Sequence, residues 1–204
     1  DDGWWYVTRT IEGKSYPVFC RSTDPSVPDV PESVMLDCNH EAELAGHGGE
    51  ADYFNVNTVA VAPVGDVLAW SLDLDGSELY EVRFRDLASG AELPDHLADT
   101  SSWGGACWSG DGQWFFYARP DDQMRPYQIW RHRLGTDQAD DTLVLQEDDL
   151  RFSLGVGSTR NRRWVVVMSQ SKSTSECWVI PGDRADDAPL PVMPRQSGIE
   201  YDID

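Results

Sequence analysis

The sequence predicts an all-β protein built from antiparallel sheets that repeat along the chain around a common axis. Two apolar runs joined by a turn occur four times, with ten residues between their landmark positions: Tyr6 and Tyr16, Trp70 and Tyr80, Tyr117 and Tyr127, Val167 and Cys177. Turn-forming residues, such as 73–77 and 120–122, lie between the runs. The four landmarks are 47 to 64 residues apart, close to the ~40–50 residues of a β-propeller blade. We therefore predict a partial β-propeller of about four four-stranded blades.

The first unit, residues 1–50, is the least regular. Its first apolar run begins at Trp4 and its second at Tyr16. The prolines within residues 23–31 prevent regular structure there, and a short helix is expected around residues 39–45. These two insertions account for the longer distance to the second unit.

The next three units, residues 51–99, 100–149 and 150–197, follow one plan. In the second unit Tyr80, Val82 and Phe84 alternate with charged residues, as in a half-buried strand. Small residues at 57–62 and 104–108 fit innermost strands crowded around an axis, residues 142–145 fit an outer strand, and a further strand is expected to begin within 198–204. The alternative is a β-sandwich with accidental periodicity, and the repeated spacing argues against it.

The net charge and the cysteines restrict the candidate partners and compartment. The 16 basic and 36 acidic residues give a net charge of −20, which repels nucleic acid and anionic lipid and attracts basic peptides. The four cysteines show neither zinc spacing nor a disulfide framework, so we expect buried free thiols and a cytoplasmic protein. The chain shows no leader sequence and stops within an apparent strand, and we expect it to be a segment of a longer protein.

The motifs give no support for chemistry within the segment itself. No G-x-S-x-G, the strained turn that exposes a catalytic serine in α/β-hydrolases, occurs in the chain. Residues 73–78 resemble the start of a calcium loop, but the glycine comes two positions early, so a hairpin turn is expected. Cys38, His40 and His47 lack a fourth metal ligand. We predict no catalytic residue, no metal site and no cofactor here.

The most specific motif is the run RPYQIWRHRLGTD at residues 125–137. It resembles the oligopeptidase B (protease II) branch of the prolyl oligopeptidase family. Further segments that resemble the family are residues 6–9, 13–17, 52–54, 82–90, 152–157, 172–176 and 200–202. The resemblance covers essentially the whole chain in order.

This resemblance implies a cytosolic serine peptidase that hydrolyses short peptides after Arg or Lys. Members of the family join a seven-bladed propeller to an α/β-hydrolase domain that carries the Ser-Asp-His triad. The chain resembles only the first part of the propeller, so the triad is expected outside it. The propeller of such an enzyme caps the active site and admits only small or flexible peptides.

Three residues are candidates for substrate gating or for contacts with the catalytic domain. Asp52 aligns with an acidic interface position of bacterial members, although a capping role at the start of a strand is equally consistent with its place. Glu78 aligns where at least one member is basic, a departure that weakens the case for one specific salt bridge. Phe116 lies close to where prolyl oligopeptidase presents an aromatic ring to substrate, with core packing as the stronger alternative.

We therefore predict a non-catalytic propeller segment of an oligopeptidase B-like serine peptidase, which gates access to its own α/β-hydrolase domain. The alternative is a stand-alone acidic propeller that acts as a binding scaffold, and the reading frame after Asp204 distinguishes the two. Because a partial propeller leaves sheet faces uncovered and strand edges unpaired, we expect self-association or marginal stability of the isolated segment.

Overall fold

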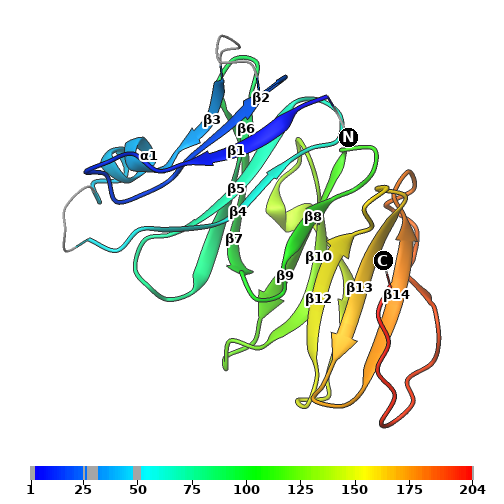
Figure 1. The fold of residues 1–204 in the computed structure, drawn as a ribbon. Helices are drawn as coiled ribbons and strands as arrows, with labels where there is room; N and C mark the ends of the chain where they lie inside the picture. Colours follow the sequence, from blue (N-terminus) through cyan, green and yellow to red (C-terminus); the bar gives the residue numbers. More distant parts are fainter. Residues whose placement is uncertain (1–2, 25, 27–31, 48–51, 204) are drawn as a thin grey trace.

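The computed structural model describes residues 3–24, 26, 32–47 and 52–203. These residues form four antiparallel sheets that follow one another in chain order, from blue to orange in Figure 1. Strands in every sheet are paired in the order in which they occur along the chain. The all-β class and the partial propeller are therefore confirmed. No helix in the described part of the chain is long and apolar enough to cross a membrane.

Three of the sheets have the expected four strands. The second sheet contains β4 (Asn55–Val61), β5 (Val67–Asp73), β6 (Leu79–Asp86) and β7 (Glu92–Ser101). The third contains β8 (Ala106–Trp108), β9 (Trp114–Pro120), β10 (Pro126–Arg133) and β11 (Thr142–Gln146), with the 3-10 helix η1 (Gln138–Asp140) before β11. The fourth contains β12 (Ser153–Ser158), β13 (Trp164–Gln170), β14 (Ser175–Pro181) and β15 (Leu190–Pro191). Strand β7 crosses the unit boundary that the sequence suggested at residue 99.

The first sheet departs from the expected pattern, because its described residues form three strands. These are β1 (Trp5–Arg9), β2 (Val18–Ser22) and β3 (Ser33–Asp37). The ten-residue spacing makes β1 equivalent to β5, β9 and β13, which are the second strands of their sheets. Each of those three strands pairs with a preceding inner strand, β4, β8 or β12. No described strand pairs with the other edge of β1, which leaves the first sheet one strand short of the plan.

The expected helix is present as α1 (Cys38–Leu44). The side chain of Asp37 caps it by accepting hydrogen bonds from the backbone N–H groups of Asn39 and His40. Asn39 exchanges two further hydrogen bonds with the backbone of Tyr16, which fastens the helix to the start of the second strand. Most of the proline-containing segment before β3 lies outside the described residues.

The inner strands meet at a common pivot, as a propeller requires. Strand β8 contacts both β4 and β12, the inner strands of the sheets on either side of it. Three apolar clusters fill the spaces between successive sheets, and their largest members include Trp70, Phe84, Phe115, Phe116 and Ile180. Burial between adjacent sheets, rather than a single central core, therefore holds the fold together.

A buried charged cluster also joins the second sheet to the third. His132 on β10 is fully buried, with its Nε2 3.0 Å from an oxygen of Asp95 on β7 and its Nδ1 2.7 Å from an oxygen of Asp141. The hydroxyl of Tyr117 donates to the other oxygen of Asp141 at 2.7 Å. Burial by itself lowers the pKa of His132, but the hydrogen bonds and charges of the two carboxylates outweigh it and raise that pKa.

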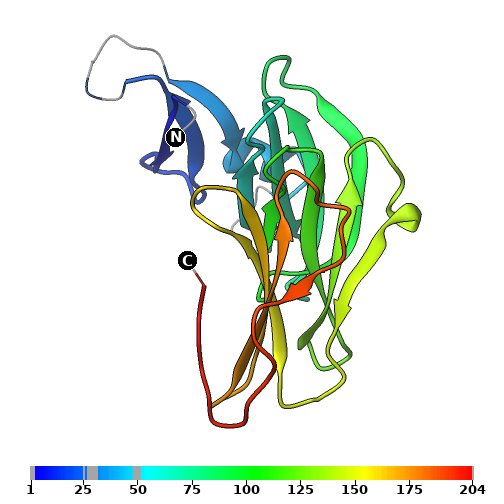
Figure 2. The ribbon, with the colours of Figure 1, turned by 90° about the vertical axis from the view of Figure 1, so that its right-hand side faces the viewer.

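The end of the chain does not form the strand that the sequence suggested. Residues 198–203 have no strand, and Asp204 lies outside the described residues. Figure 2 shows this segment, in red, running beside the fourth sheet and turning back at its lower end. The backbone N–H of Ser175 donates to the carbonyl of Ile199, and the N–H of Cys177 donates to the hydroxyl of Tyr201. Individual hydrogen bonds from side chains and backbone, instead of a continuous strand ladder, therefore attach this segment to the fourth sheet.

All four cysteines are free and buried, as expected from their spacing.

Candidate functional site

The structure brings two of the three candidate residues to one end of the sheets. The pairing of Asn55 with Asp73, and of Leu79 with Ser101, places the start of β4, the β5–β6 turn and the end of β7 together. Asp52 precedes β4 and Glu78 closes the β5–β6 turn, and both are exposed at this end. We call it the hairpin end, and it is the lower end in Figure 1.

The β5–β6 turn is a hairpin turn organised by one carboxylate, as expected from its spacing. One oxygen of Asp73 accepts hydrogen bonds from the N–H groups of Asp75 and Gly76, and the other accepts from the N–H of Glu78, all at 3.0 Å. The carboxylate of Asp73 is thereby used within the turn. The same turn places the backbone of Glu78 in the left-handed region, at φ 63°, with its side chain directed outward.

Glu78 has an aromatic partner that the sequence analysis missed. The indole N–H of Trp103 donates to an oxygen of Glu78 at 3.2 Å. Trp103 lies between β7 and β8, and 73% of its surface is exposed. A tryptophan so exposed between two well-packed strands is an unusual feature of a folded domain, and it presents a large apolar face beside a carboxylate.

Two glycines fix the position of Trp103. The N–H of Val156 donates to the carbonyl of Gly104 at 2.9 Å, which ties the loop to strand β12 of the next sheet. A Cβ on Gly104 would lie 2.2 Å from that of Ala118, and a Cβ on Gly105, where φ is +69°, would lie 2.8 Å from the carbonyl oxygen of Val156. Only glycine allows this approach, and the run W-G-G before a strand of small residues was the sequence signal for it.

Beyond Trp103 the surface is hollowed along the fourth sheet. A pocket of about 510 Å³ is lined by Trp103, Leu154, Met168, Arg151 and Lys172, among others. A second hollow of about 500 Å³ shares Arg151 and Lys172 and adds Phe152 and Arg195. The hairpin end therefore carries carboxylates on the second sheet, an exposed indole in the middle and cations on the fourth sheet.

The third candidate residue, Phe116, lies elsewhere. Its side chain on β9 is fully buried in the apolar cluster between the third and fourth sheets, together with Cys107, Ile129 and Val167. This is the core position that the sequence analysis kept as the alternative for Phe116. Its ring contributes to the packing of the two sheets and is covered on all sides.

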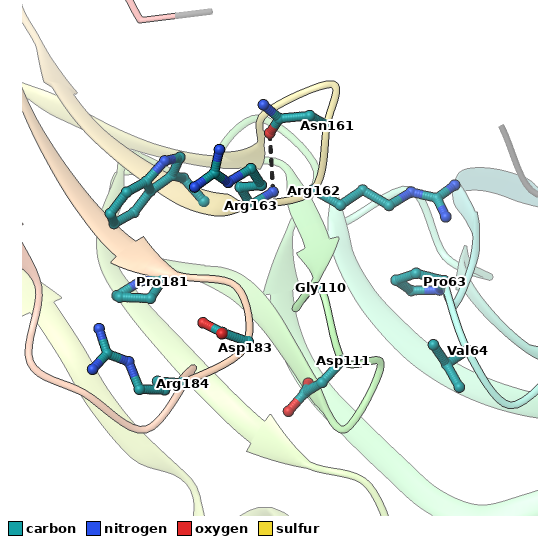
Figure 3. Close-up of a pocket in the computed structure, with 11 residues that line it drawn as sticks. Pro63, Val64, Gly110, Asp111, Asn161, Arg162, Arg163, Pro181, Asp183 and Arg184 are labelled. Atoms are coloured by element: carbon teal, nitrogen blue, oxygen red, sulfur yellow. Dashed lines mark hydrogen bonds between the residues drawn. The ribbon is translucent and has the colours of Figure 1, made fainter.

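The opposite end has a different construction, shown in Figure 3. Turns from three sheets surround a hollow of about 630 Å³. A Cβ on Gly110 or on Gly182 would lie 2.4 Å from the carbonyl oxygen of Arg162, so these turns touch through their backbones. The lining mixes Arg163 and Arg184 with Asp111 and Asp183. This end contains none of the candidate residues, and its glycine contacts indicate a structural role.

Within the described residues, no three His, Cys, Asp or Glu side chains are grouped so that they could hold a metal ion.

Comparison with known proteins identifies the relatives of this fold. The family model described as the N-terminal β-propeller domain of prolyl oligopeptidase matches residues 1–204. Protease 2 of Moraxella lacunata is 32% identical over 98% of the chain, and Dipeptidyl aminopeptidase BI of Pseudoxanthomonas mexicana is 32% identical over 99% of it. The chain spans 29% of the length of each of these relatives.

Solved structures agree with the sequence relatives. Oligopeptidase B from Leishmania major superimposes on 98% of the chain with a TM-score of 0.88 and 29% identity. Oligopeptidase B from Trypanosoma brucei superimposes on 97% with a TM-score of 0.83 and 30% identity. The matched portions are 28% and 27% of those chains.

Proposed function

This chain belongs to the prolyl oligopeptidase family, as part of its N-terminal β-propeller domain, and we propose that it is the non-catalytic propeller segment of an oligopeptidase B-like serine peptidase. In this proposal the parent protein hydrolyses short peptides after Arg or Lys in the cytoplasm. Its α/β-hydrolase domain supplies a serine nucleophile, a histidine base and an oxyanion hole. The propeller segment selects which peptides reach them.

One observation carries the assignment: the match to the family model and to two oligopeptidase B structures extends over essentially the whole chain. The net charge of −20 supports the preference for basic peptides, because a surface of that sign raises the local concentration of cationic ligands. The four buried free thiols fit a reducing compartment.

The hairpin end is the part of the segment that we assign to the gate. In this proposal Asp52 and Glu78 attract the cationic side chain of a peptide, and the exposed face of Trp103 contacts it. A cation close to the face of an indole is stabilised by about 0.5–1 kcal/mol at an exposed site. In this proposal the gate admits short or unfolded peptides and excludes folded proteins.

Peptide hydrolysis by the parent protein tests this function. We expect turnover of reporter peptides with Arg or Lys before the scissile bond and little turnover when that residue is Pro or Ala. A serine-directed inhibitor should abolish the activity. Glu78→Gln should raise KM for the Arg reporter several-fold, whereas Glu12→Gln, on an exposed turn of the first sheet, should leave it unchanged.

A second activity is favoured by the identity to the dipeptidyl aminopeptidase. That relative is as similar in sequence as Protease 2, so release of N-terminal dipeptides is the alternative specificity. A parent protein that cleaves dipeptide reporters only, and requires a free N-terminus, would contradict cleavage after internal Arg or Lys. A parent protein with no peptidase activity and no hydrolase domain would leave the acidic binding scaffold as the explanation.

A further inference from the structure

The cations at the hairpin end differ in how fully they are already paired. Arg195 is fixed from several sides, because it contacts Glu147 and Ser169, donates to Glu176 at 3.0 Å and lies 3.8 Å from the ring centre of Phe152. Its charge is therefore used inside the protein. Arg195 lines the second hollow, and its existing ion pairs leave it little capacity for a ligand.

Arg151 and Lys172 remain open to solvent. The side chain of Arg151 is 81% exposed and pairs with Asp149 at the rim. Lys172 lies in the β13–β14 turn, is exposed, and makes no ion pair with any described residue. Both side chains line the two hollows that meet along the fourth sheet.

Most of the charged side chains that line this surface are cations, in contrast to the chain as a whole. In a molecule of net charge −20, the pocket that contains Trp103 is lined by two cations and no carboxylate, and its neighbour by three cations and one carboxylate. On the far side of the Trp103 indole lies the carboxylate of Glu78. The hairpin end thus exposes a carboxylate at the second sheet and, at the fourth, a lysine that no described carboxylate neutralises.

We propose that Arg151 and Lys172 bind a carboxylate of the peptide substrate, so that a bound peptide lies across the hairpin end in one direction. Its cationic side chain is directed to Glu78 and its carboxylate to the fourth sheet. The carboxylate is either the C-terminal one or that of an Asp or Glu side chain. This inference rests on the proposed function and adds to it a second specificity element, which favours peptides that carry both signs of charge.

The physical basis is charge complementarity at both ends of one surface. Lys172 can bind a carboxylate without first breaking an ion pair to any residue that the structure describes. Arg151 already donates to Asp149 through Nε and Nη2, and the remaining edge of its planar guanidinium can donate to a second carboxylate. At exposed sites such a pair strengthens binding by up to about fivefold, and the effect weakens as salt screens the charges.

Matched peptides tested on the parent protein decide the question. One arm compares an Arg-containing peptide that has a free C-terminal carboxylate with its C-terminal amide. A second arm keeps the amide and compares Glu with Gln at successive positions after Arg. We expect kcat/KM to be about threefold to fivefold higher for the charged member of one pair, and the arm that shows the preference identifies the source of the carboxylate.

Variants of the two cations supply the decisive comparison. In Lys172→Gln and Arg151→Gln the ratio of kcat/KM between the charged and neutral peptides should fall towards one, and 0.5 M salt should do the same in the unaltered protein. Arg160→Gln, an exposed cation at the opposite end, should keep the ratio. A ratio of one in the unaltered protein, or a preference that survives both substitutions, would overturn the proposal.

Binding without hydrolysis separates this proposal from the assigned activity. Labelled analogues of the same peptides, with the bond after Arg reduced so that it cannot be cleaved, are titrated into the parent protein and followed by fluorescence anisotropy. If the parent fails to cleave after Arg or Lys but still binds the carboxylate peptide about fivefold better than the amide, and loses this in Lys172→Gln, only the proposed function fails. Equal binding of acid and amide by an active parent would refute the carboxylate site alone.

Discussion

Replacing His132 by Gln should destabilise the contact between the second and third sheets. At pH 6, below the raised pKa of His132, the substitution removes an imidazolium from between Asp95 and Asp141, whose side chains are 2% and 1% exposed. Taking one member out of such a cluster leaves buried carboxylates without a counter-charge, which typically costs about 3–5 kcal/mol. The loss is local, since the apolar cluster around Phe84 and Phe115 remains in place.

Amide hydrogen exchange of β7 and β10 in the parent protein measures this cost as a local opening free energy. A loss of 3 kcal/mol or more corresponds to exchange about a hundredfold faster in these two strands. His96→Gln is the matched control, because His96 lies 2.8 Å from Glu81 with half of its side chain exposed, and such surface pairs contribute about 1 kcal/mol or less.

The effect should also depend on pH with a defined sign. The folded-state pKa of His132 is raised above its ordinary value of 6.5, so the stabilisation by the imidazolium is complete below about pH 6.5. It is lost as the pH rises through the folded-state pKa. The difference between the unaltered protein and His132→Gln should therefore narrow above neutral pH. If the local opening free energies of the unaltered protein and His132→Gln differ by less than about 1 kcal/mol at pH 6, no more than for the control, the ion pairs of His132 do not stabilise this contact.

Three further outcomes follow from the same contacts. Gly105→Ala should destabilise the loop by about 1–3 kcal/mol, through its positive φ and the carbonyl that it meets, whereas Gly157→Ala on β12, where a Cβ meets nothing within 4 Å, should be close to neutral in thermal unfolding. Arg195→Met should shift acid unfolding to higher pH. Burial raises the pKa of Glu147, but Arg195 and other hydrogen-bond donors hold that pKa below 4.5. The ionised Glu147 therefore stabilises the fold above pH 4.5, and this stabilisation is lost as the pH falls. A thiol reagent at pH 8 should label none of the four cysteines in the native protein and all of them after denaturation. Burial raises the thiol pKa of Cys20 and Cys177, and it raises that of Cys38 and Cys107 to about 12.

The repeat could be predicted because a four-stranded blade has a fixed local geometry. Hairpin strands of similar length place the landmark residues at a constant separation, so Trp70 and Tyr80 recur as Tyr117 and Tyr127 without any knowledge of tertiary contacts. The short helix was equally local, since Asp37 caps it through its own neighbours. Among the described residues 198–203 no strand forms, because isolated apolar alternation does not supply a pairing partner.

The candidate surface at the hairpin end was only partly visible in the sequence. Glu78 was named as a candidate, but its indole partner is 25 residues away, and no periodicity links the two. No sequence pattern pointed to a role for His132, because its carboxylate partners lie on β7 of another sheet and in the loop before β11. Phe116 illustrates the opposite case, in which residue type alone suggested two roles and packing between two sheets defined its surroundings.

Local spacing and residue type were sufficient for the fold class, the blades and the acidic character of this protein, because strands, turns and net charge depend on neighbours along the chain. Which side chains meet at the hairpin end was decided by the tertiary structure. The glycines at 104 and 105 let one sheet approach the next closely enough to bring Trp103, Glu78 and Lys172 to one surface, and contacts between sheets leave no periodic trace in the sequence.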